Sequence, residues 1–169
     1  MLRGKQINQY EKGILKGIQL HKEIDKFTDS HIIVKDSIEL IKPNQGRWAP
    51  IIVDIMYDHF LAKNWMEYSD VPLADYIQEF YKILRNNFDV LPANIQKMAP
   101  LMMDSNWLLS YANLEGIDRV LGGMNRRTKN KSGMDKAGHE LKTYYTLFEA
   151  DFKVVMKDLQ KLSTAYLAA

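Results

Sequence analysis

Apolar residues recur along most of this chain at a spacing of three and four positions, which places side chains on one face of an α-helix. No segment shows the strict alternation of apolar and polar residues that is typical of a half-buried strand. Proline and glycine fall mostly between the periodic segments. The pattern therefore predicts an all-α protein, a multi-helix bundle of about six to eight helices.

The periodic segments give approximate bounds for these helices. They are 6–27, 31–41, 49–65, 72–84, 91–98, a helix from 114 that ends at Gly122 and Gly123 or soon after, and 135–168. Residues 43–46 read as a loop, 107–111 as a short apolar turn, and Pro100 is expected to kink or end the fifth helix. Asp29 or Ser30 is expected to cap the second helix, and Asp70 the fourth.

The last helix is the longest and carries apolar residues at alternating spacings of four and three, the spacing of a coiled-coil seam. The seam consists of Leu141, Tyr145, Phe148, Phe152, Val155, Leu159, Leu162 and Tyr166. We interpret this helix as the spine against which the bundle packs, and a dimer contact is the alternative. His139, near its start, receives no role from the pattern.

The length of 169 residues suits a single all-helical domain, 1–169, and a hydrophobic content of 46% is sufficient for a packed core. The chain has no cysteine, which excludes disulfides and thiolate metal sites and fits a reducing compartment. No apolar run approaches the roughly 20 residues of a membrane span, and the first residues do not resemble a signal peptide. We therefore expect a cytoplasmic protein that does not enter membranes.

The net charge of +2 is too small to indicate nucleic-acid binding, but the charge is unevenly distributed. Five cationic residues crowd one short segment: Arg126, Arg127, Lys129, Lys131 and Lys136. Such a cluster can receive an acidic partner or a phosphate. The alternative is a solvated loop without a binding role.

Two acids interrupt the apolar pattern of the third helix. Asp54 and Asp58 fall in the same helical stripe as Ile51, Leu61 and Trp65, which should pack inward. Buried carboxylates are unfavourable unless they are paired, hydrogen-bonded or metal-bound, and a bivalent cation would satisfy both. The neighbouring His59 is a third possible ligand. The alternative is an ordinary amphipathic helix whose acids lie at the solvent edge or pair with Arg47 or a lysine.

The first helix shows a similar substitution at the end of its stripe, where His21 and Asp25 lie one turn apart on one face. If the first and third helices pack side by side, this pair meets Asp54, Asp58 and His59. Carboxylates and imidazoles without a thiol suit Mg, Mn, Fe or Zn. The alternative is that His21 and Asp25 form only an intrahelical hydrogen-bonded pair.

Two stretches carry a family resemblance. One is Gly17-Ile-Gln-Leu-His21-Lys-Glu-Ile-Asp25-Lys-Phe-Thr28-Asp29-Ser-His31, and the other is Arg47-Trp-Ala-Pro-Ile-Ile-Val-Asp54-Ile-Met-Tyr-Asp58-His59-Phe60-Leu-Ala-Lys-Asn-Trp65. Both resemble the bacterial acyl carrier protein phosphodiesterases, also called acyl carrier protein hydrolases. Asn106-Trp107-Leu-Leu-Ser-Tyr111 and Ile117-Asp-Arg-Val-Leu-Gly-Gly-Met-Asn-Arg-Arg127 fit the same family, so the resemblance covers nearly the whole chain.

The resemblance implies an all-α, metal-dependent phosphodiesterase related to histidine–aspartate phosphohydrolase-type folds. The reaction it implies removes 4′-phosphopantetheine from holo-acyl carrier protein and leaves apo-acyl carrier protein with a free serine. The metal it implies is manganese, with magnesium as a possible substitute. The oligomeric state is not indicated.

On this hypothesis the metal ligands are Asp25, Asp54, Asp58 and His59, and the catalytic residues are His21, Asp58 and His59. Arg126 and Arg127 are expected to hold the phosphate, and Lys22 and Lys26 to meet the acidic carrier protein. Two other functions fit the same residues: a phosphohydrolase for another small phosphodiester, and a helical module that binds the carrier protein without catalysis.

The beginning of the chain departs from the family pattern. Family members usually start with a helix of the type Asn-Phe-Leu-Ala-His and a Gly-Asn…Ala-Asp-Phe motif, which runs into a segment like Leu2-Arg3-Gly4. This chain starts after that motif, either because it is truncated or because it is a divergent member with a depleted site. We therefore expect the chain as written to bind metal poorly and to be less active than a longer version.

Overall fold

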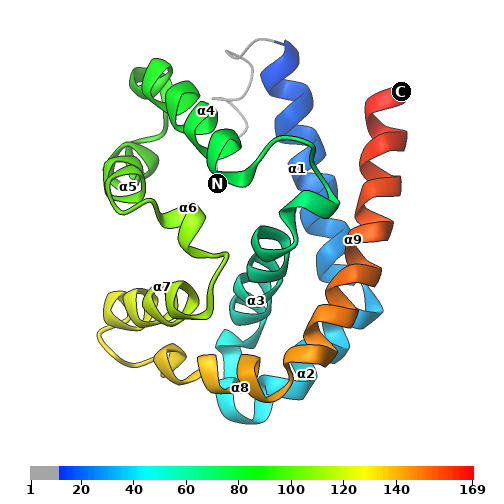
Figure 1. The fold of residues 1–169 in the computed structure, drawn as a ribbon, viewed down its shortest axis with the longest axis vertical. Helices are drawn as coiled ribbons and strands as arrows, with labels where there is room; N and C mark the ends of the chain where they lie inside the picture. Colours follow the sequence, from blue (N-terminus) through cyan, green and yellow to red (C-terminus); the bar gives the residue numbers. More distant parts are fainter. Residues whose placement is uncertain (1–11) are drawn as a thin grey trace.

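The structure, a computed structural model, describes residues 12–169, and the predicted beginning of the first helix, 6–11, lies outside them. The described part of the chain contains helices and no strand, which confirms the all-α prediction (Figure 1). The α-helices are α1 Lys12–Ser30, α2 Ile32–Gln45, α3 Ala49–Lys63, α4 Leu73–Asn86, α5 Ala93–Asp104, α6 Trp107–Ser110, α7 Leu114–Arg127, α8 Gly138–Thr143 and α9 Tyr145–Ala168. Short 3₁₀ helices are η2 Gly46–Trp48, η3 Trp65–Glu67, η4 Phe88–Val90 and η5 Met134–Lys136.

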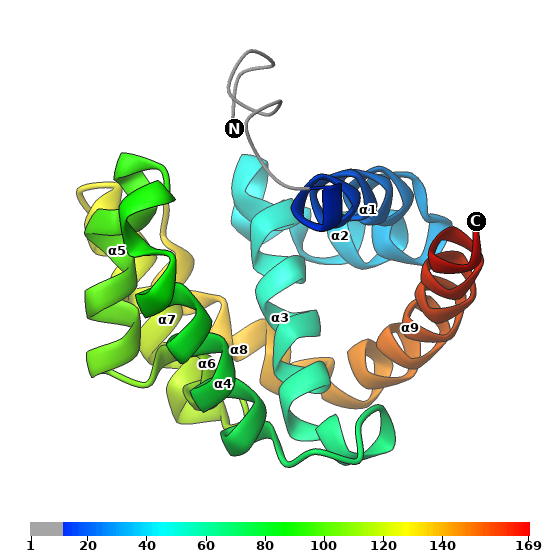
Figure 2. The ribbon, with the colours of Figure 1, turned by 90° about the horizontal axis from the view of Figure 1, so that it is seen from above.

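Helix α3 runs through the centre of the molecule. Figures 1 and 2 show it between α4 to α7 on one side and α1, α2 and α9 on the other, and it packs against α2, α7 and α9. Most of its surface is apolar and covered by these neighbours. Its buried residues are Ala49, Ile52, Val53, Ile55, Met56, Tyr57, His59 and Phe60.

The stripe of α3 that was expected to face the core does not do so. Ile51 is 38% exposed, and Asp54 and Asp58 are also reached by solvent. The core contacts come from the other faces of α3. These faces are apolar and are covered by α2, α7 and α9, so the stripe with the two acids can face solvent. The prediction of inward-facing acids was therefore wrong, although both acids do share one face.

Two helices continue through prolines, Pro43, which was expected to lie in a loop, and Pro100, which was expected to kink or end its helix. Helix α2 passes Pro43 and ends at Gln45, so 43–46 is not simply a loop, and α5 passes Pro100 and ends at Asp104. Proline removes a single backbone donor, and tertiary packing can offset that loss. Gln45, in the last turn of α2, is buried and donates to Glu140 at 2.8 Å.

The predicted side-chain caps are absent. His31 is the N-cap of α2 and Pro72 the N-cap of α4, and neither side chain accepts a capping hydrogen bond. Asp29 and Ser30 lie within α1 instead, because that helix continues to Ser30. Helix α7 passes Gly122 and Gly123 and ends at Arg127, soon after them as expected.

The long C-terminal helix is broken near its start. Met134–Lys136 is a 3₁₀ turn, and Tyr144, with φ −106° and ψ 23°, separates α8 from α9. The predicted seam nevertheless faces inward. Leu141, Phe148, Phe152 and Val155 are buried, and the other seam residues are partly buried.

The buried apolar residues form two clusters. The larger one joins α2, α3, α7, α8 and α9, and a smaller one centres on Ile77, Tyr81 and Met102 in α4 and α5. Trp107 packs against both clusters and links them. Among residues 12–169, no helix combines the length and apolarity needed to cross a bilayer.

Candidate functional site

A cleft of about 540 Å³ opens between α1, α3 and α9. Apolar side chains from α9 form one wall, and the polar lining comes from α1 and α3. The lining residues are Ile24, Asp25, Thr28, Asp29, Asp54, Tyr57, Asp58, Leu61, Phe152, Val155, Met156 and Leu159.

Four carboxylates line this cleft. Asp25 and Asp29 lie one turn apart on α1, and Asp54 and Asp58 lie one turn apart on α3. The i, i+4 spacing places each pair on one face of its helix. The structure therefore brings together three of the predicted metal ligands, Asp25, Asp54 and Asp58, and adds Asp29.

The carboxylates of α3 have raised pKa values. Burial raises the pKa of the Asp58 carboxyl to about 7, and the charge of Asp54 contributes further. The pKa of Asp54 is raised by burial first and then by Asp29 and Asp25. Water still reaches both groups from the open side of the cleft. The site thus concentrates negative charge that a cation or a cationic ligand would offset.

A buried hydrogen-bond chain supports the wall of the cleft. The Ser37 hydroxyl donates to Asp151 Oδ2 at 3.1 Å, so the Tyr57 hydroxyl, 2.9 Å away, donates to Ser37. Burial is the main reason why the pKa of Tyr57 is raised to about 12. This chain joins α2, α3 and α9 and fixes the rotation of α3 that turns Asp54 and Asp58 toward the cleft.

The described residues do not form a complete metal-binding cluster. Within 12–169, no three histidine or acidic side chains converge closely enough to hold a metal ion. The oxygen donors of the cleft suit a hard divalent cation chemically. The two pairs of carboxylates, on α1 and on α3, therefore offer suitable oxygen donors, but they do not converge on one point.

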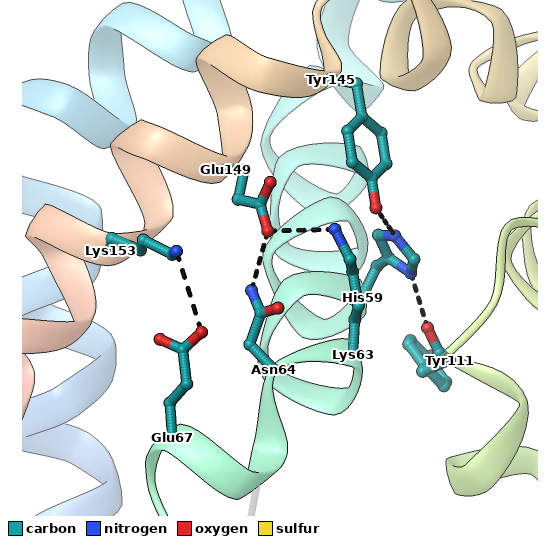
Figure 3. Close-up of polar contacts among 8 residues, drawn as sticks. All are labelled: His59, Lys63, Asn64, Glu67, Tyr111, Tyr145, Glu149 and Lys153. Atoms are coloured by element: carbon teal, nitrogen blue, oxygen red, sulfur yellow. Dashed lines mark hydrogen bonds and ion pairs between the residues drawn. The ribbon is translucent and has the colours of Figure 1, made fainter.

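His59 does not reach the cleft. Its side chain is 1% exposed, with Nδ1 2.8 Å from the Tyr111 carbonyl oxygen and Nε2 2.8 Å from the Tyr145 hydroxyl (Figure 3). The carbonyl only accepts, so Nδ1 carries the proton and Nε2 accepts from Tyr145. Burial lowers the pKa of His59. Both ring nitrogens are engaged within the core, and this predicted ligand is not brought together with the acids.

The His59 hydrogen bonds continue into a polar network on α3 and α9. Glu149 accepts hydrogen bonds from Lys63 at 3.1 Å and from Asn64 at 3.0 Å (Figure 3). A hydrogen bond to Tyr145 is the main reason why the pKa of Lys63 is raised. This network ties α3 to α9.

His21 lies close to the cleft but outside its lining. Its Nε2 is 3.4 Å from Asp25 Oδ2, and the two side chains are 74% and 55% exposed. The predicted one-turn pair is therefore present. Lys22 and Lys26 are exposed on the same helix and make no ion pair with a described residue.

Arg127 lies in the last turn of α7, outside the lining of the cleft. Its guanidinium lies over the Trp107 ring, 5.1 Å from the centroid. Burial raises the pKa of Tyr111 to about 12, the Asp58 charge adds to the shift, and the Arg127 charge opposes it. Both charges therefore act on one phenol. Arg126 is exposed at the end of the same helix.

Three residues of the site were not identified from the sequence as functional: Asp29, Tyr57 and Tyr111. Asp29 was assigned to a cap because the first helix was expected to end at about residue 27. Its spacing of four from Asp25 was the signal that would have placed it on the same face. Tyr57 and Tyr111 carry no such signal, because their roles depend on contacts between helices.

The fold and the cleft define an all-helical protein with a carboxylate-lined site between helices. The family model described as acyl carrier protein phosphodiesterase matches residues 1–159. The chain belongs to this family, whose members are hydrolases.

Individual relatives lead to the same family. An acyl carrier protein phosphodiesterase of Klebsiella pneumoniae is 31% identical over 156 residues, which are 89% of this chain and 79% of the relative. Relatives of the same description from Photorhabdus laumondii and Yersinia enterocolitica are 32% and 29% identical, over 89% and 94% of this chain and 77% and 85% of their own lengths. No solved structure matches the chain significantly.

Proposed function

We propose that this protein is a metal-dependent phosphodiesterase that hydrolyses holo-acyl carrier protein to apo-acyl carrier protein and 4′-phosphopantetheine. Family membership supports the reaction, and the relatives carry the same description. The proposal of metal dependence rests on one observation: four acids, Asp25, Asp29, Asp54 and Asp58, line the same cleft.

The proposed cation is Mn²⁺, with Mg²⁺ as a substitute, and Asp25, Asp54 and Asp58 are the residues that would hold it. Such an ion lowers the pKa of water and offsets charge on the phosphoryl oxygens. Asp29 adds negative charge beside the ligands. His59 is excluded from this set because both of its nitrogens are occupied in the core.

In the proposed reaction a water oxygen forms a bond to phosphorus while the bond from phosphorus to the serine oxygen breaks. The serine oxygen must receive a proton, and the water must lose one. Asp58, whose pKa is about 7 in the metal-free protein, would be ionised as a ligand of the cation, and the proton of the water would pass to solvent at the open side of the cleft. His21 is the one of the two predicted imidazoles that stays accessible beside the cleft, and we assign it to the leaving serine.

Arg127 is the better placed of the two predicted phosphate ligands. Its guanidinium lies over the Trp107 ring, 5.1 Å from the centroid, whereas Arg126 makes no such contact with a described residue. A fixed guanidinium can bind two phosphoryl oxygens by paired hydrogen bonds. Arg126, Lys22 and Lys26 are exposed and suit contact with the acidic carrier protein.

The ligand assignment is tested by alanine substitution. We expect Asp25→Ala, Asp54→Ala and Asp58→Ala each to lose at least about tenfold in metal affinity and about a hundredfold in kcat, since a donor and the local charge are both removed. Metal content is measured by mass spectrometry and turnover by release of phosphopantetheine from holo-acyl carrier protein. Asp70→Ala, an exposed acid outside the cleft, is the control.

The outcome also separates the rival functions. Retention of metal and activity by all three variants would refute the site. Binding of the carrier protein without turnover at saturating Mn²⁺ would favour a non-catalytic module, which carboxylates that do not converge on one point also fit. Turnover of a small phosphodiester but not of holo-acyl carrier protein would identify a phosphohydrolase of different substrate.

A further inference from the structure

Residues 119–136 hold a concentration of positive charge that the proposed catalytic site leaves largely unused. The segment has six cationic side chains and one acidic one, a net charge of +5, whereas the whole chain carries +2. The other residues together therefore carry −3. We call this segment, the second half of α7 with the following turn and η5, the basic platform. Its cationic residues are Arg119, Arg126, Arg127, Lys129, Lys131 and Lys136, and all are exposed.

The cations of the basic platform differ from many others on the surface in having no acidic partner. Six lysines elsewhere form ion pairs, namely Lys42, Lys63, Lys82, Lys142, Lys153 and Lys161. None of the six platform cations forms one with a residue that the structure describes. Like charges that are close and unpaired repel each other, and an anionic partner would remove that repulsion.

The backbone of the platform is organised around one buried side chain, Asn125. Its amide nitrogen donates to Asp135 Oδ1 at 2.7 Å, and its amide oxygen accepts from the Ser132 hydroxyl at 2.9 Å and the Gly133 amide at 3.1 Å. The Asn125 carbonyl accepts from Asn130 N at 2.9 Å. Met134, 1% exposed, anchors the end of the turn in the core.

Two residues of the turn have an unusual backbone conformation. Lys129 and Asn130 have φ values of +56° and +59°, in the left-handed region that residues other than glycine seldom adopt. The Asn125 hydrogen bonds stabilise this conformation. The cations are thus presented from a fixed backbone, which lowers the entropy lost when a partner binds.

We propose that the basic platform is a docking surface for an acidic protein, the carrier protein of the proposed reaction, and this partner assignment rests on the proposed function. Arg127, whose guanidinium lies over the Trp107 ring, belongs to the platform and is also the phosphate ligand of the proposed reaction. Charge complementarity of this kind mainly increases the association rate.

The test compares two double charge reversals. Lys129→Glu/Lys131→Glu changes the platform without touching the acids, Arg127 or His21. Lys35→Glu/Lys157→Glu is the matched control, because both lysines are exposed on α2 and α9 and pair with no described residue. Circular dichroism and thermal melting confirm that each variant folds.

Binding is measured with holo- and apo-acyl carrier protein at 50 and 200 mM NaCl. We expect the platform variant to raise Kd at least about tenfold at low salt and to flatten the salt dependence, and the control to change Kd less than about threefold. In turnover assays the platform variant should raise KM with little change in kcat. Its hydrolysis of bis-p-nitrophenyl phosphate, a small diester that needs no docking, should be unchanged.

Other outcomes overturn the docking surface. An equal effect of both variants, or an unchanged Kd for the platform variant, would exclude it, and a loss confined to Lys22→Glu/Lys26→Glu would move docking to α1. Platform-dependent binding of duplex DNA or anionic vesicles that outcompetes the carrier protein would assign a different partner. Binding is measured separately from turnover. Absence of any hydrolysis would therefore refute the proposed function, but the binding assay would still test the docking surface.

Discussion

The pKa of Asp58 is raised because of the position of this residue on α3. Its helix is apolar on nearly every other face, so protein atoms enclose the carboxylate while its own side of the cleft stays open. The resulting pKa of about 7 lies above the value of 3.8 expected in the unfolded chain. In metal-free buffer, the folded protein therefore holds more protons than the unfolded one between these two values.

The sign of this difference gives a prediction for stability. The contribution of Asp58 is most favourable below pH 4 and is lost as the pH rises through 7, because the folded state must then ionise an acid that it disfavours. We expect Asp58→Asn to increase the free energy of unfolding by about 1 kcal/mol at pH 8 and to change it little at pH 4. This value is small because solvent at the open side screens the charge.

Urea denaturation in chelator at the two pH values measures this effect, with the exposed Asp70→Asn as the control. A variant that is less stable than the parent at pH 8 would show that the Asp58 carboxylate makes favourable contacts. That result would conflict with the raised pKa.

At the scale of elements, the orientation of α3 is set by polar contacts. A helix that is apolar around most of its circumference gains similar hydrophobic energy in several rotations, because the hydrophobic effect is not directional. The chain Tyr57–Ser37 fixes one side of α3, and the bonds of His59 to the Tyr111 carbonyl and Tyr145 fix another. These contacts turn the acids toward the cleft.

The contact between α6 and α7 depends on Gly116. A Cβ at this position would lie 1.7 Å from the Ser110 carbonyl oxygen, and backbone cannot easily move away. At Gly138, a Cβ would lie 1.9 Å from Asp118 Oδ1, but that side chain can rotate at the expense of its surface ion pair with Lys142. Alanine substitutions at the two glycines can therefore be compared directly, because one clash is with backbone and the other with a side chain.

We expect Gly116→Ala to lower the free energy of unfolding by about 2–3 kcal/mol, since the two helices must separate. Gly138→Ala should cost about 1 kcal/mol or less, because only a surface ion pair is lost and alanine favours the helix. Chemical denaturation of both variants checks the order. Equal losses would indicate that α6 can shift as easily as a side chain.

At the scale of the whole molecule, the two apolar clusters are of unequal size. The cluster of α4 and α5 contains three buried residues, Ile77, Tyr81 and Met102, and connects to the main core through Trp107. Tyr76 and Ile83 on α4 stay about half exposed. Opening this part removes little apolar surface from contact, so it should require less free energy than global unfolding.

We therefore expect amides of α4 and α5 to exchange with deuterium at least about tenfold faster than those of α3. Ile77→Ala should accelerate exchange in α4 and α5 alone, and Ile52→Ala, in the main core, should accelerate it throughout. Hydrogen exchange with mass spectrometry resolves these segments. Equal protection of α3 and α4 would show that the two clusters unfold together.

The order of helices was predictable because local periodicity reports which face of a segment is apolar. The seam from Leu141 to Tyr166 was identified in this way, and so was the pairing of Asp54 with Asp58. Helix ends were less predictable at Pro43 and Pro100, where a lost backbone hydrogen bond is offset by packing that involves distant residues such as Glu140.

The sequence by itself determined that Asp25, Asp54 and Asp58 interrupt apolar helices and can share a site, because spacing along a helix fixes the face on which a side chain lies. Only the tertiary structure decided that these acids line an open cleft and that His59 turns into the core. The direction in which a face points depends on which neighbours cover the helix. That choice is made by contacts such as Tyr57 with Ser37 and His59 with Tyr145, between residues far apart in the chain.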